Sequence, residues 1–184
     1  MKAVGFIARL SAIVILLFGV TVTPAVAQNN CAPFSGTVYA ALYPDAPEQP
    51  PTWHAVGNFT IGKDSHHATI AVSGRIPPIP GGPGVLLGGE LWTFDFGEGN
   101  TVQLTTDFVA EHLTDASGVF HVREVGQFVN GTGAFKHAYG SLTAEGPFGP
   151  AVVLPNITEL PTQAIFFWVA PSQGMICGSN NRDQ

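Results

Sequence analysis

Beyond residue 30 the chain alternates between short hydrophobic runs and polar breaks, and no run keeps the 3.6-residue period of an amphipathic helix. The runs are rich in β-branched and aromatic residues and are separated by Gly, Pro, Asn and Asp, which is typical of strands joined by turns. Such short, closely spaced strands favour an all-β barrel or sandwich. The pattern predicts eight strands, over 35–43, 52–61, 67–75, 85–96, 101–110, 118–130, 134–144 and 162–170.

Some of the intervening segments carry more specific expectations. Residues 44–51 and 77–84 are rich in Pro and Gly, so we expect loops that cannot continue a strand ladder. The second loop is either a stiff connector or a lid over a barrel mouth. Asn130 and Gly131 predict a tight hairpin turn, because both residue types tolerate a positive φ. Residues 107–115 stay open between a strand and a helical turn.

The N-terminal segment has the layout of a secretory signal peptide. Two basic residues precede a 13-residue apolar run, and Ala25 and Ala27 form a small-residue cleavage site. A membrane anchor is the alternative, but the run is shorter than the roughly 20 residues needed to span a bilayer. We therefore expect a signal peptide at 1–27, a single β-barrel domain at 28–184, and a secreted or periplasmic protein.

Composition narrows the function classes. The 184-residue chain is 45% hydrophobic and 11% charged, with a formal net charge of −6, which argues against a disordered chain or a coiled coil. Cleavage after Ala27 would remove two of the seven Lys and Arg and none of the 13 Asp and Glu. The remaining domain then has no electrostatic basis for binding nucleic acid or an anionic membrane. No later apolar run is long enough to span a bilayer, so we expect no stable membrane insertion.

The cysteines and histidines are the residues that could form a disulfide or hold a metal. Cys31 and Cys177 are the two cysteines, and in an oxidising compartment an even count of two predicts one disulfide. Such a bond requires the first and last strands to lie side by side. Free thiols or metal ligands are the alternative, but no C-x-x-C spacing is present. The six histidines show no H-x-H or H-x-x-x-H spacing, so we predict no metal site.

One segment resembles a known family. Residues 126–146 read GQFVNGTGAFKHAYGSLTAEG, a G-T-G-x-F turn followed by a strand containing A-x-G. This is similar to the hairpin signature of the allene oxide cyclase and dirigent barrel families, and the match extends over residues 85–146. The preceding order of strands also fits: one strand has an internal Glu, the next is rich in Thr, and G-x-F-x-V follows.

The resemblance implies an eight-stranded antiparallel β-barrel, calycin-like in shape, with a hydrophobic interior cavity. Plant relatives cyclise an oxylipin epoxide or steer phenoxy-radical coupling, and bacterial relatives of similar shape include polyketide cyclases. The cyclases use no cofactor, so none is expected here, and a homo-oligomer is common among the plant forms. The implied function is to bind a hydrophobic small molecule and to isomerise or cyclise it without a cofactor.

Side-chain alternation along two strands singles out two carboxyl groups. Glu90 lies on the aromatic face of 85–96, and Glu124 on that of 118–130. If these faces point inward, burial raises the pKa of each carboxyl and suits it to general acid–base catalysis. Alternatively, the glutamates are structural, or the aromatic faces lie outside beneath a neighbouring subunit. The aromatic residues expected to contact a ligand with them are Trp92, Phe94, Phe120 and Phe128.

Tyr139 and His137, which share a face beside the G-T-G turn, are further candidate donors to a ligand or else surface residues. No G-x-S-x-G sequence supports nucleophilic serine chemistry. Two functions remain: a cofactor-free isomerase or cyclase, and a non-catalytic barrel that carries an apolar ligand or acts as an envelope interaction module. A buried Glu90 beside a cavity favours the first, and a solidly filled barrel favours the second.

Overall fold

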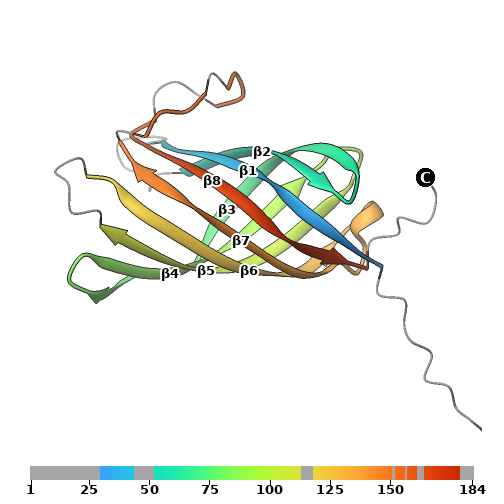
Figure 1. The fold of residues 1–184 in the computed structure, drawn as a ribbon, viewed down its shortest axis with the longest axis horizontal. Helices are drawn as coiled ribbons and strands as arrows, with labels where there is room; N and C mark the ends of the chain where they lie inside the picture. The colour runs from blue at the N-terminus through green and yellow to red at the C-terminus, as the bar shows by residue number, and fades with distance from the viewer. Residues whose placement is uncertain are drawn as a thin grey trace, which may run out of the picture.

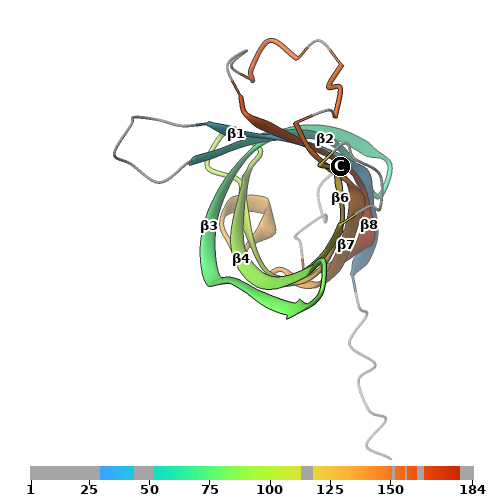
Figure 2. The ribbon, with the colours of Figure 1, turned by 90° about the vertical axis from the view of Figure 1, so that its left-hand side faces the viewer.

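The protein is an eight-stranded antiparallel β-barrel, as predicted (Figures 1 and 2). The computed structural model describes residues 30–43, 52–112, 118–150, 152–155, 157–160 and 164–178. Each strand pairs with its neighbours in chain order, and the first strand pairs with the last to close the ring. The strands are β1 (Cys31–Tyr43), β2 (Thr52–Ile61), β3 (Asp64–Gly82), β4 (Val85–Asp95), β5 (Thr101–His112), β6 (Phe120–Gly131), β7 (Tyr139–Gly149) and β8 (Phe166–Cys177).

The seam between β1 and β8 carries the predicted disulfide. Cys31 lies directly opposite Cys177 in the strand register, and the two are bonded, with their Cα atoms 3.9 Å apart. The bond lies at the right-hand end of the barrel in Figure 1, where the first strand starts and the last strand stops. The disulfide prediction and its topological consequence are therefore confirmed.

The Pro- and Gly-rich segment predicted as the loop 77–84 is mostly strand, and that prediction is wrong. β3 continues to Gly82, and its pairing with β4 shifts register three times between Gly74 and Gly82. Such bulges accommodate residues that cannot donate to a regular ladder, which explains why the prolines do not end the strand. β5 likewise extends to His112, which excludes a helical turn over 107–112; residues 44–51 and 113–117 lie outside the described residues.

The β6–β7 connection also differs from prediction. Asn130 and Gly131 end β6 instead of forming a two-residue turn, and the positive φ values fall at Gly133 and His137. A short 3₁₀ helix, η1 (Gly133–Phe135), replaces the first residues of the strand predicted at 134–144, because the ring of Phe135 turns inward to pack on Phe96. β7 accordingly starts about five residues later than expected, and β8 starts about four residues later than expected.

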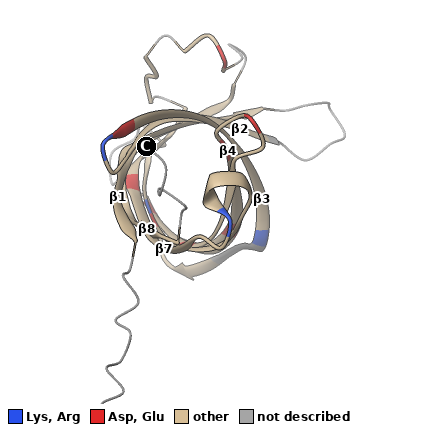
Figure 3. Ribbon diagram, turned by 90° about the vertical axis from the view of Figure 1, so that its right-hand side faces the viewer, with Lys and Arg blue, Asp and Glu red and all other residues tan. Residues whose placement is uncertain are grey.

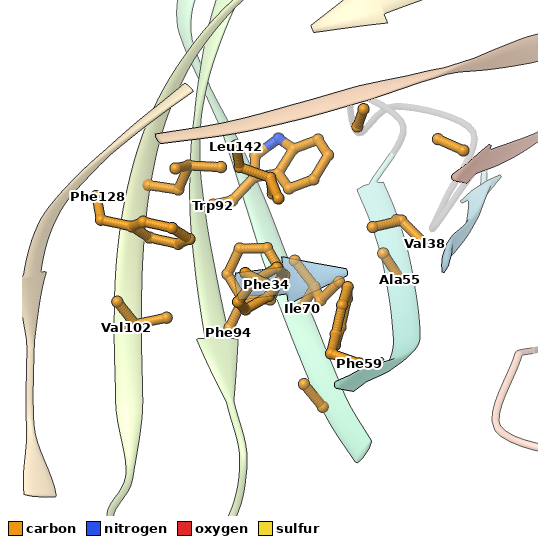
Figure 4. Close-up of a cluster of buried hydrophobic side chains, with 14 of the residues drawn as sticks. Phe34, Val38, Ala55, Phe59, Ile70, Trp92, Phe94, Val102, Phe128 and Leu142 are labelled. Atoms are coloured by element: carbon orange, nitrogen blue, oxygen red, sulfur yellow. The ribbon is translucent and has the colours of Figure 1, made fainter. Parts of the chain in front are cut away.

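One half of the barrel interior is filled by aromatic and aliphatic side chains. Phe34 and Phe94 are at most 1% exposed, and their ring centroids lie 6.1 Å apart. Figure 4 shows these rings beside Phe59, with Phe128 and Val102 completing the layer. Phe96 and Phe135 close the end near the disulfide, with ring centroids 4.8 Å apart. We call this packed half the aromatic plug.

A second, smaller cluster lies outside the barrel. Part of the connection between β7 and β8 lies outside the ring of strands (Figure 2) and buries Leu160 against Ala41, Tyr43 and Val56 of β1 and β2. This packing explains why β1 has buried residues on both faces near its end.

Charge is sparse over the rest of the barrel. Figure 3, viewed from the end with the disulfide, shows Lys, Arg, Asp and Glu as scattered segments of a mainly uncharged ribbon. Within the described residues no helix is long and apolar enough to cross a membrane. The predicted signal peptide at 1–27 lies outside the described residues.

Candidate functional site

The other half of the barrel interior encloses an apolar cavity of about 270 Å³. It lies between the aromatic plug and the end of the barrel where β4 begins and β5 ends. Its wall consists of two glutamates and fourteen apolar residues, contributed by all eight strands. They are Val38, Ala40, Leu42, Trp53, Ala55, Val72, Leu86, Glu90, Trp92, Phe108, Ala110, Phe120, Val122, Glu124, Phe148 and Trp168.

The register of three neighbouring strands brings the two carboxyl groups together. Glu90 of β4 is paired with Thr106 of β5, and Glu124 of β6 is paired with Phe108, two residues further along β5. Residues two apart on a strand share a face, so all four side chains belong to the inner face of the barrel. The two glutamates therefore flank β5 from either side and meet inside the cavity.

Gly88 of β4 leaves space for an aromatic ring of the cavity wall. A Cβ atom on Gly88 would lie 2.4 Å from the ring of Phe108, the residue paired with it on β5. The absence of a side chain at Gly88 thus allows the Phe108 ring to lie flat against β4, where it forms part of the cavity wall beside Glu124.

The two carboxyl groups differ in their hydrogen bonds. The indole Nε1–H of Trp92 donates to Oε2 of Glu90 at 2.8 Å. The carboxyls of Glu90 and Glu124 are hydrogen-bonded to each other. The Thr106 hydroxyl lies beside Glu124 and donates to the main-chain carbonyl oxygen of Glu90 at 3.5 Å. Glu124 is only 4% exposed, and its Oε2 atom has no hydrogen-bond partner among the described residues. A buried polar atom without a partner is costly and calls for an explanation.

Burial raises the pKa of both carboxyls. The pKa of Glu124 lies well above its usual range, first because the group is removed from water and then because the charge of Glu90 is close. The pKa of Glu90 is raised by burial, but the hydrogen bonds from Trp92 and Glu124 favour its charged form and oppose the rise. As the pH rises, Glu90 therefore loses its proton first, and over the following pH range the pair shares one proton and carries one negative charge.

Such a pair offers an acid and a base to a molecule in the cavity. Protonated Glu124 can donate a proton, and ionised Glu90 can accept one, in surroundings where water does not screen either group. Of the described residues that line the cavity, none is Lys, Arg or His. No cluster of three or more His, Cys, Asp or Glu side chains that could hold a metal occurs within the described part of the chain.

The structure brings together some of the sequence-predicted site residues and separates others. Glu90, Glu124, Trp92 and Phe120 line the cavity. Three do not: Phe94 and Phe128 have the expected inward orientation but belong to the aromatic plug, and Tyr139 is 49% exposed at the opposite end, beside the disulfide.

Several residues of the cavity wall were not predicted from the sequence. Trp53, Phe108 and Trp168 fall within predicted strands on inward positions, so alternation along those strands could have found them. Phe148 could not be found this way, because it lies beyond the predicted end of its strand. Thr106 gave no signal by itself, since its role depends on Glu90 and Glu124 meeting beside it.

The raised pKa of Glu124 predicts how stability depends on pH. A carboxyl whose pKa is higher in the folded than in the unfolded chain makes the folded state bind more protons, so stability decreases as pH rises from about 4.3, the unfolded value, through the folded value. The free energy of unfolding should therefore fall by roughly 1–3 kcal/mol over this range in the wild type and much less in Glu124→Gln. Urea denaturation at a series of pH values measures this.

The exposed Glu145 of β7, which hydrogen-bonds His121 outside the barrel, provides the control. Glu145→Gln should retain the wild-type decrease. Equal pH dependence of the wild type and Glu124→Gln would show that Glu124 titrates alike in the folded and unfolded chain.

No protein-family model, curated protein or solved structure matches this chain. The similarity of residues 126–146 to the allene oxide cyclase and dirigent families stays a prediction, and the site has to be interpreted from its own geometry.

Proposed function

We propose that this protein is an exported β-barrel that binds a compact hydrophobic molecule in its interior and moves protons on it, as a cofactor-free isomerase or cyclase. The observation that carries the proposal is the carboxyl pair in the apolar cavity, above all the buried Oε2 of Glu124 without a hydrogen-bond partner. A ligand atom placed there would satisfy it.

The shape of the interior supports binding. A barrel that needed only a stable core could be filled throughout, as the aromatic plug fills its own half. Instead about 270 Å³ is left open beside Trp92 and Trp168, close to the lower end of the roughly 300–1,000 Å³ typical of small-molecule sites. The cavity therefore suits a compact molecule with one or two polar atoms.

The chemistry supports proton transfer without a cofactor. Glu124 would donate its proton to a polar atom or carbon of the ligand while Glu90 removes a proton from a second position. The ligand's atoms and electrons are then rearranged without net change, and the proton now on Glu90 returns to Glu124 along their hydrogen bond. General acid–base groups of this kind typically accelerate a reaction about 10²–10⁴-fold.

Two separate features support an exported protein. Residues 1–27 have the pattern of a signal peptide, and the Cys31–Cys177 disulfide is of the kind that persists in oxidising surroundings. Together they support function outside the cytoplasm.

Uptake of a neutral fluorophore tests the binding function. N-phenyl-1-naphthylamine should bind the wild type saturably with one site per chain. Ala110→Phe places a ring inside the cavity and should weaken this binding at least about tenfold, because the added ring occupies the ligand's volume. Fluorescence titration measures both.

Ala71→Phe is the matched control, because Ala71 is exposed on the outer face of β3. It should bind the fluorophore as the wild type does. Absence of saturable uptake by the wild type, or equal weakening by both substitutions, would contradict binding in the barrel.

A non-catalytic carrier would use the same cavity. The two functions separate at the carboxyl pair: Glu90→Gln and Glu124→Gln should abolish turnover of an identified substrate while keeping fluorophore uptake. Full turnover in both variants would remove the proton-transfer role.

A further inference from the structure

The described residues of the cavity wall include acidic groups but no basic group to balance them. Glu90 and Glu124 belong to its wall, and none of the lining residues is Lys, Arg or His. The nearest cation on β3, Arg75, lies on the outer face, where its guanidinium bonds to Asp107 and donates to the carbonyl oxygen of Thr106 at 2.9 Å. An uncompensated carboxylate in apolar surroundings is expensive unless a partner of opposite charge arrives.

The described residues of the rim do not supply that partner either. His112, at the end of β5, is exposed, and its ring packs edge-on against Phe120, with the centroids 4.9 Å apart. It lies beyond Ala110, the last cavity-lining residue of β5, and so lies outside the cavity where the carboxyls meet. Thr106, the other polar residue beside them, is uncharged.

The rest of the wall is unusually aromatic. The rings of Trp92 and Trp168 lie next to the carboxyls, edge to face, with centroids 5.6 Å apart. Both indole N–H groups are already engaged, one with Glu90 and the other with the carbonyl of Gly146 at 3.2 Å. These two indoles, which lie next to the carboxyls, therefore have no N–H left for a ligand anion and offer their π systems, which attract cations.

We propose that the natural ligand is a compact apolar amine, bound as a monocation with its ammonium group between the Glu90–Glu124 pair and the indole rings. The inference rests on the proposed binding function and names its ligand class. The ammonium N–H groups would donate to the free Oε2 of Glu124 and to Glu90. One positive charge matches the single negative charge of a pair that shares one proton, whereas an anionic ligand would be repelled.

Three probes with one carbon skeleton test the charge requirement: 3-phenylpropylamine, 3-phenylpropanol and 3-phenylpropanoate, which carry one positive, no and one negative charge at pH 7. Isothermal titration calorimetry on the full domain should show the amine binding at least about tenfold more tightly than the alcohol, since charge-assisted hydrogen bonds and cation–π attraction add to the same apolar contact. The carboxylate should bind most weakly.

Variants of the two glutamates test whether the carboxyl pair causes the preference for the amine. Glu124→Gln leaves the ionised Glu90 carboxylate in place and should reduce the amine-to-alcohol ratio only in part. Glu90→Gln removes the charged group of the pair and should reduce the ratio to within about twofold of unity. Both variants should keep alcohol binding. Glu111→Gln removes the same charge from the exposed outer face of β5 and should leave the ratio unchanged.

The outcomes separate this inference from the proposed function. Equal binding of the amine and the alcohol, tighter binding of the carboxylate, or a preference that survives in Glu90→Gln would overturn the amine assignment and leave the binding function intact. Failure of all three probes while N-phenyl-1-naphthylamine still binds would also overturn it. Failure of every probe, the neutral fluorophore included, would instead remove the proposed function itself.

Discussion

Replacing Cys31 and Cys177 together by serine is expected to lower the free energy of unfolding by about 4–5 kcal/mol. The disulfide joins residues 146 apart in sequence, so it restricts almost the whole described chain in the unfolded state. In the chain-entropy model, a loop of this length is worth close to 5 kcal/mol. Chemical denaturation followed by tryptophan fluorescence measures the change.

The variant should nevertheless fold. The register between β1 and β8 extends over twelve residue pairs, from Cys31 opposite Cys177 to Leu42 opposite Phe166, so the seam keeps its backbone hydrogen bonds without the disulfide. Reductant should destabilise the wild type by a similar amount and leave the double serine variant unaffected. A change below about 1 kcal/mol in the variant would show that the disulfide hardly constrains the unfolded chain.

Phe94→Ala is the second large effect, with an expected loss of about 3–5 kcal/mol. The Phe94 ring is 0% exposed and contacts the rings of Phe34, Phe59 and Trp92, with centroids 5.5–6.1 Å away. Its removal leaves a void in the aromatic plug that the surrounding closed sheet cannot collapse to fill, so the cost includes both lost burial and a cavity. Urea denaturation gives the value.

Phe120→Ala is the matched control within the same barrel. Phe120 is half-buried and lines a cavity that is already open, so its truncation should cost only about 1–2 kcal/mol. Equal losses for the two variants would mean that the two halves of the interior are packed alike, which would contradict the division into a plug and a cavity.

This division separates the part of the domain that provides stability from the part that holds the candidate site. The plug and the disulfide stabilise the end where η1 and the first and last strands meet. The other end carries features that reduce stability: an open volume and two buried carboxyls, one with an unpartnered oxygen. Groups that cost stability in a buried site are frequently the functional ones.

Alternation along the strands predicts much of this site. Glu90 and Trp92 share a face of 85–96, and the same parity in 118–130 places Glu124 with Phe120, because side chains two apart on a strand point the same way. Alternation shows which side chains point inward, but not how far along the barrel axis each of them lies. That position depends on strand tilt and on the register of all eight strand pairs. Phe128 points inward like Glu124 and Phe120, but it lies at a different position along the axis and therefore belongs to the plug.

The ends of several strands were also predicted wrongly, and tertiary contacts explain why. Prolines usually end a strand, but β3 passes through its proline-rich segment by shifting register against β4. Phe135 looks like part of a strand, yet its ring packs into the plug beside Phe96 and leaves a 3₁₀ turn before β7. Neither outcome is encoded in the local sequence pattern.

The most direct test of the whole account is a ¹³C NMR titration of the glutamate side-chain carboxyls in the complete domain, assigned with Glu90→Gln and Glu124→Gln. We expect one carboxyl, that of Glu124, to titrate with a pKa well above the usual range because it is buried beside Glu90, and both resonances to shift when a ligand enters the cavity. If every glutamate instead titrated near its ordinary value and none responded to a ligand, the carboxyl pair would not lie in a sheltered binding cavity.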